Sequence, residues 1–283
     1  MNLLRLVSVI GLIGSHLLLL ALQIDGAEAA GIKVLIVDGQ NNHDWRATTP
    51  LMRSMLEDGG FTVQVATVPA EGLERDEFTV PLDRVHVVVG NFTDIGGAPA
   101  PTRFFDELTT WVAAGGGFVA VHAATAGMEH LPDYVRMVGL GWGNAGRGDR
   151  LVVDDSGRVI RTPKGEGPNT GHGPIEPIQV TVRSDHPIVH GLPQQWQVRD
   201  ELWFAARGPA EGLHVLATGY APQTEQNEPV LWTVDFGKGR VFVQLLGHDT
   251  DTMQDVSFRT TLIRGCQWAA TGRVTLPVPA DFR

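Results

Sequence analysis

Three histidines stand where apolar, strand-like stretches of the sequence end. They are His43, His122 and His248. An imidazole titrates near neutral pH, so it can remove and return a proton, and in its neutral form it binds divalent metals. If the three stretches are parallel strands of one sheet, their carboxyl ends meet at a common edge, where ligands bind. The pattern therefore predicts one polar site at that edge.

The predicted catalytic residues combine two of these histidines with two carboxylates: His122, His248, Asp249 and Glu201. We expect the histidines to act as acid and base, Asp249 or Asp44 to orient an imidazole, and Glu201 to hold a substrate hydroxyl. Structural alternatives stay open, because an aspartate can cap the helix that follows it and a buried histidine can bond a carbonyl group.

Further residues are predicted to bind substrate: His43, Asp44, Trp45, Asn91, Trp142, His172 and Asp200. His172 has a glycine on either side, which exposes it and allows the backbone to approach a ligand closely. An acidic pair beside tryptophan suits a sugar, because carboxylates accept hydrogen bonds from hydroxyls while an indole covers the apolar face of the ring. Each tryptophan taken alone could equally be a core residue.

A divalent metal is a second use for the same side chains. Its ligands would come from the histidines at positions 43, 122, 172 and 248 together with an acidic residue. None of these four histidines belongs to a His-x-x-x-His or His-Glu-x-x-His pattern, so no metal site is assigned and no cofactor is predicted. The sequence also has no Walker-type phosphate loop, and no Gly-x-Gly-x-x-Gly pattern joins a predicted strand to a predicted helix, which argues against a nucleotide cofactor.

The composition narrows the class of partner. Of the 283 residues, 43% are hydrophobic and 19% charged, which is typical of a globular protein. The net charge of −10 and the lack of a basic run argue against nucleic acid or an anionic membrane surface. Cys266 is the single cysteine, which excludes an intramolecular disulfide. A small carbohydrate is the expected partner, and a homo-oligomer stays open.

Residues 1–29 are predicted to be a secretory signal peptide. Arg5 precedes an apolar run from Leu6 to Leu22, and Ala27-Glu28-Ala29 offers small residues at the spacing that signal peptidase needs. An uncleaved N-terminal anchor is the alternative, although the run is short for a bilayer span. We therefore expect an exported protein, periplasmic or extracellular.

An alternation of strands and helices opens the mature chain and predicts an α/β fold. The predicted elements are strands at 33–38, 61–68, 85–89 and 118–121, and helices at 48–58 and 101–114. Continuous apolar runs of strand length are typical of strands covered on both faces. This predicts a mostly parallel, flavodoxin-like sheet flanked by helices, connected by right-handed crossovers.

The alternation of predicted strands and helices ends after residue 122. Residues 123–177 are rich in glycine and are predicted to form a long irregular insertion. A C-terminal β-hairpin follows, with strands at 229–235 and 240–246, and then a last helix at 257–270. Residues 31–272 are interpreted as one domain, and residues 273–283 as a C-terminal tail.

Several stretches together make the chain resemble the ThuA-like, or trehalose-utilisation, family. They are residues 42–45, 116–123, 186–193, 200–202, 237–248 and 268–269. The resemblance runs from about residue 33 to residue 270. It implies a fold like that of class I glutamine amidotransferases and a role in disaccharide catabolism, where 3-keto-sugars are plausible substrates.

The same resemblance argues against glutaminase activity. Amidotransferases place a cysteine on the sharp turn after a strand, and here that position holds His122. Their His-x-Glu pair corresponds to His248-Asp249-Thr250, and Cys266 lies in the predicted last helix. A neutral imidazole is a poor substitute for a thiolate that attacks an amide. We therefore expect this protein to share the fold of the amidotransferases but not their glutaminase activity.

The sequence thus favours acid–base chemistry on a sugar or 3-keto-sugar, by a hydrolase, lyase or isomerase. A keto group acidifies the neighbouring C–H, so a positioned base can drive enolisation or elimination of the glycosidic oxygen. Two alternatives stay open. One is a non-catalytic sugar-binding module, and the other is a hydrolase with a histidine-ligated divalent metal.

Overall fold

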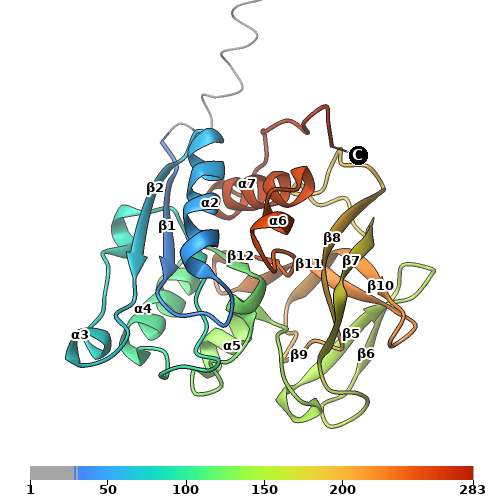
Figure 1. Ribbon diagram of the computed structural model, residues 1–283, viewed down its shortest axis with the longest axis horizontal. Helices are drawn as coiled ribbons and strands as arrows, with labels where there is room; N and C mark the ends of the chain where they lie inside the picture. Colours follow the sequence, from blue (N-terminus) through green and yellow to red (C-terminus); the bar gives the residue numbers. More distant parts are fainter. Residues whose placement is uncertain (1–28, 30, 283) are drawn as a thin grey trace, which may run out of the picture.

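The computed structural model describes Ala29 and residues 31–282, so the predicted signal peptide lies outside the described residues apart from Ala29. Across this part of the chain, twelve strands form one sheet, whose main path runs β2-β1-β3-β4-β12-β11-β10-β7-β8 (Figure 1). Within the same residues, no helix combines the length and apolar character needed to cross a membrane.

One half of the sheet is parallel. Its strands are β1 (Lys33–Asp38), β2 (Thr62–Thr67), β3 (Val87–Gly90), β4 (Gly117–Val121) and β12 (Gly239–Gln244). Val121 at the end of β4 pairs with Gln244 at the end of β12. The residues that follow these two strands therefore leave the sheet side by side, although about 120 positions separate them in the sequence.

Helices cover both faces of the parallel half (Figure 1). α2 (Trp45–Asp58) and α7 (Val256–Thr271) pack on one face, and α4 (Thr102–Ala113) and α5 (Pro132–Val138) on the other. Alternate residues of one strand serve the two cores: Ile36 joins the first and Val37 the second. Burial on both faces explains the continuous apolar runs of these strands.

The other half is antiparallel and continues the sheet beyond β12. Its strands are β5 (Asp149–Val153), β6 (Val159–Thr162), β7 (Gly171–Val182), β8 (Gln195–Phe204), β9 (Arg207–Gly208), β10 (Leu213–Ala221) and β11 (Gln226–Phe236). β11 and β12 form the predicted hairpin. The α/β fold class, with its parallel sheet flanked by helices, is confirmed.

Two sequence-based predictions differ from the structure. The stretch 123–177 is not irregular throughout, since it holds α5, β5, β6 and the start of β7. α5, β5 and β6 are short, and β5 and β7 also pair with strands far along the chain, so local periodicity does not reveal them. α2 begins at Trp45, and Pro50 lies inside it, because Asp44 caps the helix three residues earlier than expected. Only the short helices α3 (Leu73–Asp76) and Leu82–Arg84 lie between β2 and β3.

The C-terminal segment packs back onto the domain. The buried guanidinium of Arg264 in α7 donates to the carbonyl oxygens of Ile188 and Leu276, at 2.7 and 2.8 Å. The ring of Phe282 lies edge-on to Trp196 in β8, with centroids 5.3 Å apart. The predicted tail therefore makes a polar contact with α7 and an apolar contact with the antiparallel half.

Candidate functional site

His122 stands directly after β4, on a sharp turn. Its φ of 46° lies in the left-handed region, which costs a residue other than glycine about 1–3 kcal/mol and is common at functional sites. The ring is buried, and Nδ1 donates to the carbonyl oxygen of Leu245, which lies 2.7 Å away and directly follows β12. Burial, and then the neighbouring His43, lower the pKa of His122. This imidazole is therefore neutral, with the lone pair on Nε2.

His43 reaches the same place from the loop after β1. Its Nδ1 lies 3.2 Å from Oδ1 of Asn41. Asn41 in turn donates from Nδ2 to Asn91, whose own amide donates to Thr48 and Thr49 in α2. This relay makes Oδ1 of Asn41 an acceptor, so His43 carries its hydrogen on Nδ1. Burial first, and then His248, lower the pKa of His43.

Asn91 was predicted to bind substrate, and the structure places it elsewhere. Its side chain is buried and its hydrogen-bonding groups are used by α2 and Asn41. Asn91 therefore orients His43 through Asn41. The sequence did not single out Asn41, because nothing in its local pattern distinguishes it from Asn42.

His248 follows β12, and the buried carboxyl group of Asp200 in β8 fixes its backbone. Asp200 accepts from the backbone N–H groups of Gly247 (2.7 Å), His248 (3.3 Å) and Glu201 (2.7 Å). Burial raises the pKa of Asp200 to about 7, although these donors favour its charged form. Asp200 is fully buried and lies outside the pocket lining, so it positions residues instead of binding a substrate hydroxyl.

Glu201 lies at the centre of the cluster. Its Oε2 is 3.1 Å from Nδ1 of His248 and 3.2 Å from Nδ1 of His172, and its Oε1 is 4.0 Å from Nε2 of His122. Trp203, two residues along the same strand, donates its indole N–H to Oε1 at 2.7 Å. Burial alone would raise the pKa of Glu201, but the contacts with His248, Trp203 and His122 lower it below its usual value.

The three predicted histidines are in mutual contact. The ring centroid of His43 lies 4.7 Å from that of His122 and 4.6 Å from that of His248. Together with Glu201, each of them presents one ligand atom, and these four atoms lie within 4.8 Å of one another. This group, His43, His122, His248 and Glu201, is called the histidine cluster below. Within the cluster, the contact between His248 and Glu201 raises the pKa of His248.

A pocket of about 440 Å³, called the histidine pocket below, opens beside the histidine cluster. Its lining residues are Asn42, His43, Ile95, Ala123, Ala126, Trp142, His172, Glu201, Trp203 and His248. Trp142 packs edge-on against Trp203, with centroids 5.1 Å apart, and its ring lies 5.7 Å from that of His172. The pocket thus combines one carboxylate, several imidazoles and an aromatic wall.

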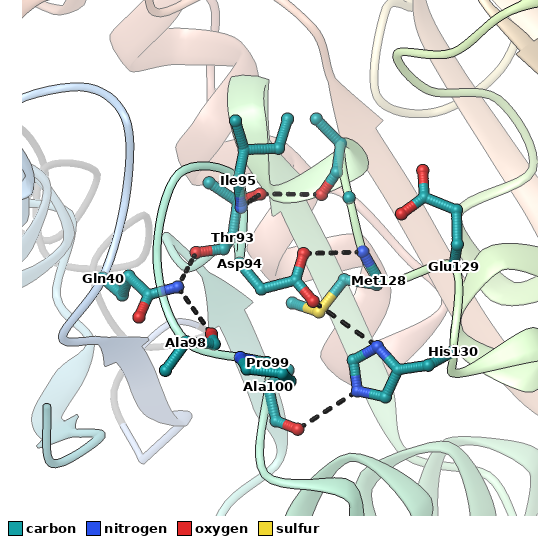
Figure 2. A network of polar contacts seen from close by, with 12 residues as sticks. Gln40, Thr93, Asp94, Ile95, Ala98, Pro99, Ala100, Met128, Glu129 and His130 are labelled. Atoms are coloured by element: carbon teal, nitrogen blue, oxygen red, sulfur yellow. Dashed lines mark hydrogen bonds and ion pairs between the residues drawn. The ribbon is translucent and has the colours of Figure 1, made fainter. Parts of the chain in front are cut away.

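A larger cavity, about 1230 Å³, adjoins this pocket, and Ile95 and Trp142 line both. Figure 2 shows the polar network at its edge. Asp94 accepts from the backbone N–H of Met128 at 2.8 Å, and its other oxygen lies 3.5 Å from Nδ1 of His130. Gln40 donates to the carbonyl oxygens on either side of this loop, those of Thr93 and Ala98. The network ties together the loops that follow β1, β3 and β4.

Three predicted residues, in addition to Asn91, Asp200 and His122, lie outside the lining of the histidine pocket. Asp44 accepts from the backbone N–H of Ala47 and caps α2, and Asp249 accepts from that of Thr252 and caps α6 (Thr250–Met253). The guanidinium carbon of Arg46 lies over the ring of Trp45, 4.2 Å from its centroid. Trp45 lines a different pocket. The structure gives the two aspartates the capping role that the sequence left open as an alternative.

Trp203 is a pocket residue that was not among the predicted site residues. Glu201 and Trp203 are two positions apart in β8, so they project from the same face of the strand. That spacing is the signal by which the sequence could have indicated it. Cys266 lies buried in α7 outside the pocket lining, and burial raises the pKa of its thiol.

Comparisons with known proteins agree with the sequence resemblance. The chain matches the ThuA family, described as trehalose utilisation, over residues 33–269. A ThuA-like protein from Parabacteroides merdae is 33% identical, with a TM-score of 0.81 over 89% of this chain and 94% of that chain. A ThuA-like protein from Bacteroides uniformis, 18% identical, shares the fold with a TM-score of 0.56 over 87% and 95% of the two chains. No curated protein matches. The chain belongs to the ThuA (trehalose utilisation) family.

Proposed function

We propose that this chain is an enzyme that acts on a sugar or 3-keto-sugar by proton transfer in the histidine pocket. The observation that carries the proposal is the placement of His172 and His248, each within 3.2 Å of the same oxygen of Glu201. An ionised carboxylate beside two imidazoles is an arrangement that can hold and move a proton. The association of the family with trehalose utilisation supports a carbohydrate substrate.

The shape of the pocket supports the same class of substrate. A sugar ring has apolar C–H faces and a rim of hydroxyl groups, and the pocket offers Trp142 and Trp203 for the former and Glu201 for the latter. The adjoining cavity, which shares Trp142, gives a second sugar unit room beyond the first. We therefore propose a disaccharide, or its 3-keto form, as the substrate.

The chemistry can be written for a 3-keto-disaccharide. A base takes the proton from C2, next to the carbonyl, and the electron pair of that C–H bond forms a C1–C2 double bond. The C1–O glycosidic bond breaks, and the departing oxygen takes a proton from an acid. Carbon and oxygen keep their overall oxidation level, so the step needs no redox cofactor. Return of the proton without bond cleavage would instead give isomerisation.

The side chains differ in their fitness for these roles. The lowered pKa values of His43 and His122 make their imidazoles weak bases. His172 is half-exposed, and its Nδ1 lies between Glu201 and the carbonyl oxygen of Gly173, 2.8 Å away. Nδ1 therefore carries the hydrogen, and the lone pair on Nε2 is available as a base. His248, whose pKa is raised, suits the role of acid.

We further propose that the chain is exported, on the strength of the leader-like composition of residues 1–29. The expected result is a chain in the exported fraction that begins close to residue 30. Mass spectrometry of its N-terminus measures this directly. Recovery of the intact chain from the cytoplasm alone would contradict the proposal.

The function is tested with a panel of disaccharides and their 3-keto derivatives. We expect turnover of at least one member, and a loss of about 10²-fold or more in the His172→Gln variant, because glutamine cannot accept the proton. Product formation is followed by mass spectrometry. His214→Gln is the matched control, since His214 is exposed, pairs with Asp235 and lies outside the site.

Two outcomes would count against the enzyme. Saturable binding of a sugar with no product after prolonged incubation would indicate the non-catalytic binding module. Equal turnover by the wild type and the His172→Gln variant would remove His172 from the mechanism and leave proton transfer to His248 alone.

A further inference from the structure

We infer that the histidine cluster is a binding site for a divalent first-row cation of the zinc type. The ligands are one ring nitrogen each from His43, His122 and His248 and one carboxylate oxygen from Glu201. Its part in catalysis rests on the function proposed above, whereas the binding itself does not. The two can therefore fail separately.

The spacing of the four ligand atoms is close to that of a metal centre. They lie within 4.8 Å of one another. Bonds of about 2.1 Å around a tetrahedral ion place ligands about 3.4 Å apart, and opposite ligands of an octahedral ion lie about 4.2 Å apart. The contact between Glu201 and His248 already has a length of 3.1 Å. Small inward shifts of the side chains would complete the shell.

Hydrogen bonds outside the cluster prepare two of the rings as ligands. His122 donates from Nδ1 to Leu245, and His43 donates from Nδ1 to Asn41. In each ring the lone pair is thereby left on Nε2. Metal-binding histidines characteristically donate their other N–H to a carbonyl or carboxylate group, which sets the tautomer and the ring orientation.

The electrostatics of the cluster favour a cation between His122 and Glu201. Nε2 of His122 is buried and has no hydrogen-bond partner among the described residues, and it lies 4.0 Å from Glu201 Oε1. Both atoms are acceptors, so without a positive charge between them they repel. Leaving such a buried acceptor unsatisfied costs about 1–3 kcal/mol. A bound cation satisfies Nε2 and neutralises Glu201 at once.

The donor set selects the kind of metal. Three imidazole nitrogens and one carboxylate oxygen suit zinc and its first-row neighbours, whereas magnesium and calcium prefer oxygen ligands throughout. The cation would lie beside the histidine pocket, where it could polarise a carbonyl or hydroxyl oxygen of the substrate. His172 is outside the cluster, so its Nε2 remains free to transfer a proton, whereas His248 can serve as the acid only in the metal-free chain.

The test is a calorimetric titration of the full chain, treated with chelator, with zinc chloride and separately with magnesium chloride. We expect one zinc ion per chain and no comparable uptake of magnesium. His43→Ala and His248→Ala are expected to abolish stoichiometric uptake. Asn41→Ala, which removes only the orienting partner of His43, should weaken zinc binding about 10- to 100-fold. His214→Ala should bind as the wild type does.

The readings separate metal binding from turnover. Absence of stoichiometric zinc uptake by the folded wild-type chain, or unchanged uptake by both His43→Ala and His248→Ala, would overturn the inference. Thermal unfolding of each variant shows whether it is folded, and Asn41→Ala leaves the ligands themselves intact. Zinc uptake without turnover of any sugar refutes the proposed function alone. Turnover that survives chelation in a chain that binds no zinc refutes the inference alone.

Discussion

Replacing Glu201 by glutamine is expected to lower the turnover of the sugar substrate by about 10²- to 10⁴-fold. The variant keeps the shape of the side chain and an oxygen that can accept the indole N–H of Trp203. It loses the negative charge, and the lowered pKa of Glu201 means that this charge is present throughout the neutral range. His172 and His248 would lose the partner that holds their protons. Steady-state kinetics with the substrate found in the panel measures the loss.

Glu228→Gln is the matched control for this variant. Glu228 is also a buried glutamate, but it pairs with Arg150 and accepts from Thr224 at 2.8 Å, outside the pocket lining. We expect this control to lose stability and keep its turnover per folded molecule. A Glu201→Gln variant that retains at least a tenth of wild-type turnover would show that the carboxylate is not part of the proton-transfer machinery.

Asp200→Asn is expected to damage stability and turnover together. The carboxyl group serves three backbone N–H groups, and an amide places its NH₂ against at least one of these donors. Each buried donor left without an acceptor costs about 1–3 kcal/mol, so we expect the free energy of unfolding to fall by about that amount. Because two of the donors belong to Gly247 and His248, the ring of His248 should also move. Chemical denaturation and kinetics of the same preparation measure both effects.

Asp235→Asn provides the comparison for Asp200. Asp235 is exposed and pairs with His214 on the surface, so its replacement should change the stability by no more than about 0.5 kcal/mol. An Asp200→Asn variant with wild-type stability but no turnover would contradict the positioning role. It would indicate that Asp200 contacts the substrate, as the sequence had suggested.

The parallel half of the fold was predictable because its pattern is local. Each strand covered on both faces is a continuous apolar run, and glycines mark where the helices end. Parallel strands must bring their carboxyl ends to one edge, so a histidine at the end of a strand can be assigned to that edge from its position alone. His43, His122 and His248 are such residues, and the structure brings them into contact. The insertion lacked this information, because its elements are short and β5 also pairs with β9 and β11, far along the chain.

The sequence by itself determined which segments meet at the edge of the sheet, and with them the histidines and the class of chemistry. Only the tertiary structure decided what each neighbouring polar side chain does. Glu201 enters the pocket while Asp200, one residue before it, bonds the backbone beyond β12. Asp44, Asp249 and Asn91 likewise serve the backbone or another side chain. The physical reason is that a strand's end is set by its own residues. The direction and partner of a polar side chain are set by whichever distant segment packs against it.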